Sequence, residues 1–173
     1  MSERVDCLVV GTGPVGMVAA CALAQAGLTV GLAGPNAIPE RDGRTVAILD
    51  RGVKLIQSLG LWGAAEDVAA PLVEMRIIDD TGSLFRAPPV TFRASELGLD
   101  AFGKNIELTD LVKQLSGALK SQPNLKYWPE AVNGFQRRND GIIATALMSG
   151  AIIECRMLIG ADGRHSKVRE FAG

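Results

Sequence analysis

The first 33 residues alternate between apolar runs and glycine-rich breaks. Residues 5–10 are apolar except for Asp6 and include three valines, which is typical of a parallel strand buried on both faces. Residues 15–25 are apolar nearly all round and rich in alanine, which predicts a buried helix lying close to a sheet. Gly27 follows where a helix often ends in a left-handed residue, and residues 28–33 predict a second strand. The pattern therefore predicts a strand–helix–strand unit.

Beyond this unit the apolar periodicity changes along the chain. Apolar positions in residues 46–59 fit a helix that ends at Gly60, and those in residues 109–120 fit a helix with Thr109 as its cap. Alternation predicts antiparallel strands between and after these helices, separated by turns such as Asn139-Asp140-Gly141. The expected strands span residues 73–79, 83–87, 90–93, 125–128, 131–137, 142–148 and 151–159.

Composition and charge exclude several classes of protein. The net charge of −1 gives no electrostatic footprint for nucleic acid. Residues 7–39 carry no charge, but glycines and prolines interrupt them too often for a membrane span, and no signal peptide is recognisable. Three separated cysteines and one histidine favour buried thiols in a cytoplasmic protein over a disulfide framework or a metal site.

The turn between the first strand and the first helix reads Gly-Thr-Gly-Pro-Val-Gly at residues 11–16. In such a fingerprint Gly11 permits the tight turn, and Gly13 lets the backbone approach a pyrophosphate. Gly16 permits close packing of the helix, whose N-terminal amides face the phosphate charge. The position of this fingerprint between a buried strand and a small-residue helix predicts nucleotide binding.

The acidic residue that usually follows the second strand and binds the ribose hydroxyls is absent, because Gly34 stands at that position. Restoring an acid by Gly34→Glu is therefore expected to tighten nucleotide binding. A missing acid is also how some such folds accept a 2′-phosphate, for which Arg41 and Arg44 are candidate partners. These residues alone leave FAD and NADP as alternatives.

A second signature lies near the other end, where residues 160–169 read GADGRHSKVR. With the first fingerprint, it resembles the pair of motifs in FAD-dependent aromatic hydroxylases, the single-component flavoprotein monooxygenases. Residues 42–48 (DGRTVAI), 59–62 (LGLW), 92–96 (FRASE) and 102–106 (FGKNI) resemble the branch that hydroxylates intermediates of ubiquinone biosynthesis. The resemblance covers the whole chain and implies an α/β fold, a Rossmann-type FAD-binding domain over residues 1–173.

The resemblance also implies roles for individual residues. Arg44 would lie along the phosphate–ribityl side of the flavin, and the strand at Val132 would offer its backbone to the adenine. Asp162 would serve the nucleotide, cap the helix that follows, or do both, while His165 would face solvent. At Leu108, many members of the family carry a polar flavin contact instead. The expected cofactor-binding residues are Gly11, Gly13, Pro14, Val15, Gly16, Gly34, Arg44, Val132, Asp162 and Gly163.

The activity implied is hydroxylation of a polyprenylated phenol, an aromatic small molecule, with FAD as cofactor, NAD(P)H as electron donor and dioxygen as co-substrate. No side chain is nominated as a catalytic acid or base. Residues 72–107 would belong to the antiparallel strands of the substrate domain, and the C-terminal half of the family's fold would lie beyond residue 173, so we expect the chain alone to be inactive. Peripheral membrane association and a homo-oligomer stay open for the whole protein. The alternative is a non-catalytic NADP- or FAD-binding module.

Overall fold

The computed structural model describes residues 2–36, 43–82 and 84–173, and the chain divides into two compact units. The first unit comprises Met1–Arg41 and Leu111–Gly173, and the second comprises Asp42–Asp110. Each unit is described by itself below. Within the described ranges, no helix has the length and apolar character that crossing a membrane requires.

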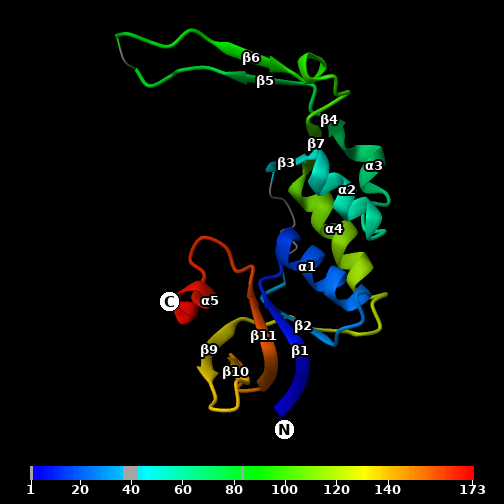
Figure 1. The fold of residues 1–173 in the computed structure, drawn as a ribbon, viewed down its shortest axis with the longest axis vertical. Helices are drawn as coiled ribbons and strands as arrows, with labels where there is room; N and C mark the ends of the chain where they lie inside the picture. Colours follow the sequence, from blue (N-terminus) through cyan, green and yellow to red (C-terminus); the bar gives the residue numbers. More distant parts are fainter. Residues whose placement is uncertain (1, 37–42, 83) are drawn as a thin grey trace. The chain divides into compact units, whose positions relative to one another are not determined.

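A six-stranded sheet organises the first unit, with the strand order β8-β2-β1-β11-β10-β9 (Figure 1). The four strands β8, β2, β1 and β11 run parallel, and β10 and β9 continue the sheet antiparallel. The strands are β1 (Ser2–Val10), β2 (Val30–Ala33), β8 (Leu125–Trp128), β9 (Val132–Arg137), β10 (Ile143–Leu147) and β11 (Ile152–Gly160). These strands confirm the expected positions to within a few residues.

The predicted strand–helix–strand unit is present at the centre of this sheet. Helix α1 (Pro14–Gln25) connects β1 to β2 and packs against both strands. Gly27 follows the helix with a φ of 91°, the left-handed conformation expected at this position. Because Leu8 and Val9 are both fully buried and side chains alternate across a strand, β1 is covered on both faces, as its apolar run indicates.

Two further helices complete the covering of this unit. Helix α4 (Leu108–Leu119) begins in the second unit and buries Leu111, Val112, Leu115 and Leu119 on one face. It starts one residue before Thr109, so Thr109 lies in the first turn and the prediction that it caps the helix is wrong. The short helix α5 (Lys167–Ala172) packs against β9 and β11, where Phe171 contacts Phe135.

The second unit holds smaller sheets. Strand β3 (Thr45–Leu49) pairs antiparallel with β7 (Gly103–Glu107), which also pairs with β4 (Ala70–Pro71). Strands β5 (Glu74–Ile77) and β6 (Val90–Arg93) form a separate two-stranded hairpin. Helices α2 (Asp50–Ser58) and α3 (Ala65–Val68) and the 3-10 helix η1 (Ala94–Leu97) connect these strands.

Two predictions for the second unit are wrong. The helix expected over residues 46–59 is a strand, β3, followed by a shorter helix that starts at Asp50, because β3 is held by pairing with the distant β7. The strand expected over residues 83–87 is not present in its described part, residues 84–87. There the Asp79 carboxylate accepts hydrogen bonds from the amides of Thr81 and Ala87 and organises a loop instead; Ser83 lies outside the described residues.

Candidate functional site

The glycine-rich turn and the second signature meet at the carboxyl ends of the parallel strands. The Gly11 amide donates to the carbonyl of Ala33 at the end of β2 over 2.8 Å, and the Ala161 amide donates to the carbonyl of Val10 at the end of β1 over 2.7 Å. The two motifs are therefore neighbours through β1 and β11, which pair in parallel along their whole length. Crevices at this end of an open parallel sheet are where such folds bind ligands.

Three glycines shape this junction in different ways. A Cβ on Gly11 would lie 2.1 Å from the Ala161 carbonyl oxygen, and a Cβ on Gly16 would lie 1.9 Å from the Gly11 carbonyl oxygen. Both contacts are impossible, so these two positions require glycine for packing. A Cβ on Gly13, in contrast, would meet nothing within 4 Å. Gly13 therefore presents open backbone next to the first turn of α1, as a pyrophosphate cradle requires.

A pocket of about 390 Å³ opens over these motifs, within the range of small-molecule sites. It lies wholly in the first unit. The residues that line it are Val10, Gly11, Thr12, Gly13, Gly34, Pro35, Ala131, Val132, Ala161, Asp162, Gly163, His165 and Lys167. Six of the predicted site residues are thus brought together: Gly11, Gly13, Gly34, Val132, Asp162 and Gly163.

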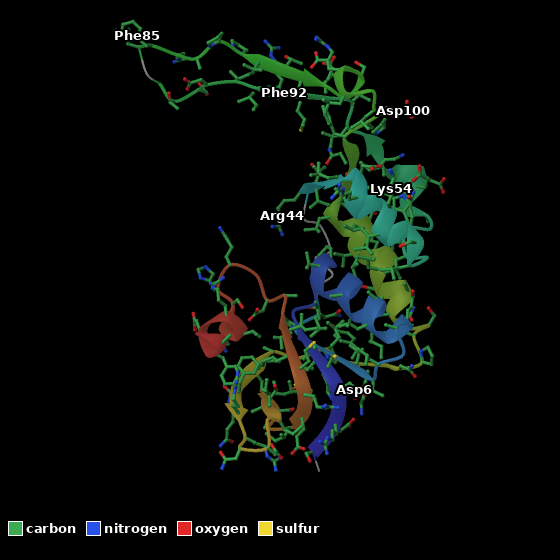
Figure 2. All side chains as sticks on the ribbon, in the orientation of Figure 1. Asp6, Arg44, Lys54, Phe85, Phe92 and Asp100 are labelled. Atoms are coloured by element: carbon green, nitrogen blue, oxygen red, sulfur yellow. The ribbon has the colours of Figure 1, made fainter. Side chains whose placement is uncertain are left out.

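The other predicted residues have different positions. Pro14, Val15 and Gly16 form the first turn of α1 and are not among the lining residues that the structure describes. Arg44 belongs to the second unit, where its carbonyl accepts a hydrogen bond from the Leu108 amide over 2.8 Å (Figure 2). The alternative phosphate partner Arg41 lies outside the described residues.

Asp162 performs the capping role that was one of its two expected functions. Its Oδ1 accepts a hydrogen bond from the Ser166 hydroxyl over 2.5 Å, and its Oδ2 accepts one from the Val168 amide over 3.3 Å. Ser166 in turn caps α5 by accepting a hydrogen bond from the Arg169 amide over 3.0 Å. Asp162 therefore holds the loop of the second signature against α5, where its carboxylate still lines the pocket.

Seven of the described lining residues are absent from the predicted set: Val10, Thr12, Pro35, Ala131, Ala161, His165 and Lys167. Thr12 is an unassigned position of the fingerprint, and Lys167 occupies a variable position of the second motif, so neither motif marks it. The Lys167 ammonium donates to the Val132 carbonyl over 3.1 Å, which occupies part of the backbone expected to meet an adenine. His165 is exposed as expected, yet it lines the pocket.

None of the three cysteines is among the described residues that line this pocket. All three cysteines are free and buried, and burial raises the pKa of Cys21 and of Cys155 to about 11, so both thiols are protonated at neutral pH. The described part of the chain contains no cluster of three or more metal-ligating side chains. The open backbone of Gly13 beside the N-terminus of α1 suits binding of an anionic ligand along the glycine cradle.

Two known proteins are similar to nearly the whole of this chain. Ubiquinone hydroxylase UbiL of Rhodospirillum rubrum is 32% identical over 97% of this chain and 39% of its own length. The 3-demethoxyubiquinol 3-hydroxylase of Escherichia coli is 30% identical over 99% of this chain and 44% of its own length. The chain thus spans about two fifths of the length of these relatives.

Solved structures show the same fold. The flavin-dependent monooxygenase PieE, solved with FAD and substrate, matches 98% of this chain and 32% of its own with a TM-score of 0.76 at 21% identity. The p-nitrophenol 4-monooxygenase PnpA of Pseudomonas putida matches 99% of this chain and 44% of its own with the same TM-score at 20% identity. The model of the FAD binding domain matches residues 4–173, so the chain belongs to the FAD binding domain family.

Proposed function

We propose that this chain is the FAD-binding part of a flavin-dependent monooxygenase, and that its pocket holds the adenosine and pyrophosphate end of FAD. The observation that carries the proposal is the glycine cradle. Close packing requires glycine at positions 11 and 16, whereas Gly13 leaves its backbone open to the pocket beside the N-terminus of α1. The residues present fit a pyrophosphate, because backbone amides and the helix dipole both favour an anion there.

The roles of the chain's own residues follow from this placement. Gly13 and the first turn of α1 would hold the pyrophosphate, while Gly34 and Val132 would border the adenosine. Asp162 would fix the loop that closes the pocket through its bonds to Ser166 and Val168. FAD supplies the oxygen-activating chemistry when bound, and the protein contributes binding and orientation. No described side chain of the pocket is assigned a proton-transfer step.

For the whole protein we propose hydroxylation of a polyprenylated phenol in ubiquinone biosynthesis, with NAD(P)H as electron donor and dioxygen as co-substrate. The names of the relatives UbiL and 3-demethoxyubiquinol 3-hydroxylase support a quinone-related aromatic substrate. Catalysis would draw on the part of those proteins that this chain does not span. The second candidate function, an NADP-binding module, is favoured by Gly34 in place of an acid and by Lys167 in the same pocket.

The FAD proposal is tested by titrating the chain with FAD and following flavin fluorescence. Gly13→Asp puts an anionic side chain into the open cradle, where nothing within 4 Å of its Cβ disturbs the fold. We expect it to weaken FAD binding at least about tenfold through charge repulsion. Gly117→Asp is the matched control, since Gly117 is exposed on α4 with equally open surroundings. Equal FAD affinity of both variants, or tight NADP binding without FAD binding, contradicts the proposal.

A further inference from the structure

Nucleotide-binding folds of this type place a ribose-binding carboxylate at the position directly after β2. Gly34 is buried at this position and lines the pocket. Its amide donates to the Trp128 carbonyl at the end of β8 over 3.1 Å, so its backbone is fixed by the neighbouring strand. A residue replacing Gly34 would therefore have to fit its side chain into the space that the existing backbone leaves.

That space is taken by Thr12. A Cβ built on Gly34 would lie 2.9 Å from Thr12 Cγ2, 3.0 Å from its Oγ1 and 3.1 Å from its amide nitrogen. Thr12 is only 4% exposed, and its hydroxyl donates to the Pro35 carbonyl over 2.5 Å. A β-branched side chain has few rotamers, and leaving this one would break the bond to Pro35. Thr12 thus fills the place where an acid at position 34 would begin.

We propose that Thr12 and Gly34 act as a coupled pair that excludes the ribose carboxylate and leaves the pocket tolerant of a 2′-phosphate on the adenosine. This inference rests on the proposed function, because it concerns the ribose of a bound nucleotide. Thr12 takes the place of the acid with a neutral, internal hydrogen bond that ties the fingerprint turn to the loop after β2. The pair determines specificity by removing a repulsive charge rather than by adding an attractive one.

The charges that line the pocket agree with this tolerance. Asp162 is the one carboxylate among the described lining residues, and both of its oxygens already accept hydrogen bonds from Ser166 and Val168. Lys167 brings a positive charge to the same pocket. An added 2′-phosphate would face this positive charge as well as the Asp162 carboxylate, which its hydrogen bonds to Ser166 and Val168 hold against α5.

The pair reverses the effect that sequence alone predicts for Gly34→Glu. The sequence predicts tighter binding from a restored acid, whereas the structure predicts that this single change pushes the Cβ into Thr12. Thr12→Ala removes Cγ2 and Oγ1, the two atoms nearest to that Cβ, and leaves the backbone amide at 3.1 Å. The acid should therefore be accommodated only in the double variant Thr12→Ala/Gly34→Glu.

A double-mutant cycle tests the pair in two independent ways. The wild-type chain, Thr12→Ala, Gly34→Glu and the double variant are compared by thermal unfolding without ligand. The same four proteins are titrated with FAD, with ADP and with 2′-phosphoadenosine 5′-diphosphate. We expect Gly34→Glu to lower Tm and to weaken FAD and ADP binding about tenfold, and the double variant to recover most of both losses.

Comparing ADP with 2′-phosphoadenosine 5′-diphosphate tests whether the pocket tolerates a phosphate on the ribose 2′-hydroxyl. The wild type should bind ADP and its 2′-phosphorylated form with affinities within about threefold of each other, and the double variant should prefer ADP by about tenfold or more. Additive Tm changes, or tighter FAD binding by Gly34→Glu alone, would overturn the pair while leaving FAD binding intact. Coupled Tm changes without FAD binding by any variant would support the steric pair and overturn the proposed FAD site instead.

Discussion

The central strand β1 and the hairpin β5–β6 both carry large apolar side chains, but they differ in how far these are buried. Leu8 and Val9 of β1 are fully buried, whereas Ile77 of β5 is 62% exposed and Phe92 of β6 is 44% exposed. The loop between β5 and β6 carries Phe85 at 88% exposure (Figure 2). The apolar side chains of β1 are covered within its own unit, whereas several large apolar side chains of the hairpin stay exposed.

This difference predicts that the first unit contributes more to the free energy of unfolding than the hairpin does. The first unit has a continuous sheet with close backbone contacts, and an isolated two-stranded hairpin is marginal in water. Substitutions matched in chemistry should therefore have unequal effects in the two units.

The sharpest comparison uses two glycines with positive φ. Gly11 has a φ of 116° and would place a Cβ 2.1 Å from the Ala161 carbonyl oxygen, whereas Gly82 has a φ of 74° and open surroundings. Gly11→Ala should lower the free energy of unfolding by more than about 4 kcal/mol, since backbone must move. Gly82→Ala should cost about 1–2 kcal/mol from conformational strain alone. Urea unfolding followed by circular dichroism measures both free energies. Equal losses would show that Gly11 is not packed more tightly than Gly82.

A second comparison truncates two leucines. Leu8 is fully buried in β1, and Leu84 is 92% exposed beside the hairpin. Leu8→Ala should lower the free energy of unfolding by about 2–5 kcal/mol through the cavity it leaves. Leu84→Ala should change it by less than about 0.5 kcal/mol. The same urea titrations apply, and a comparable loss from Leu84→Ala would show that the hairpin is packed in solution.

Helix caps give a third, smaller contrast. Ser166 caps α5 with its side chain, whereas α2 begins after Leu49, which is 64% exposed and makes no capping bond. Ser166→Ala should destabilise the chain by about 0.5–2 kcal/mol, and Leu49→Ser should stabilise it by up to about 1 kcal/mol. Differential scanning calorimetry measures whether each substitution lowers or raises Tm. A lower Tm for Leu49→Ser would mean that its contribution to β3 exceeds that of a cap.

The smallest effects concern two exposed carboxylates. Hydrogen bonds from the Thr29 hydroxyl and amide lower the pKa of Asp6 below 3.8, and the Ala87 amide and Thr81 do the same for the pKa of Asp79. A lowered pKa stabilises the fold above the unfolded value, and this stabilisation is lost as the pH falls through the folded value. Asp6→Asn should therefore lower Tm at pH 7, with a difference from wild type that shrinks below pH 3.8.

Asp79→Asn is the matched control for Asp6→Asn. Asp6 ties β1 to the residue before β2, whereas Asp79 organises a loop beside the hairpin. Because that loop lies outside the packed core, we expect the Tm of Asp79→Asn to follow that of the wild type at every pH. A Tm loss as large as that of Asp6→Asn would place the loop within the cooperative unfolding unit.

The parts of the fold that sequence could predict are those held by local pattern. Residues 5–33 were identifiable because glycines and a small-residue helix set their turn, and residues 125–160 because turns such as Asn139-Asp140-Gly141 separate their strands. Strand β3 was mistaken for a helix because it is specified by β7, far along the chain, rather than by its own periodicity. Non-local pairing leaves no signal in a local window.

The same limit applies to the candidate site. The glycine motifs indicated the pocket, but the role of Thr12 depends on the distance from its side chain to an absent Cβ on Gly34, which no sequence pattern contains. The capping by Asp162 was recognisable as one of two alternatives, because an acid before Ser166 is a familiar start of a helix. The FAD-binding roles of individual residues stay predictions.

The pairing of β1 with β11 also has a consequence for the order of events during synthesis. Strand β1 leaves the ribosome well before β11, which is one of its two neighbours, so β1 remains open on that side until residues 152–160 have emerged. The wall of the pocket formed by Ala161 and Gly163 does not exist before then. A nascent chain that ends before β11 therefore lacks this wall of the pocket and could not yet hold a nucleotide there.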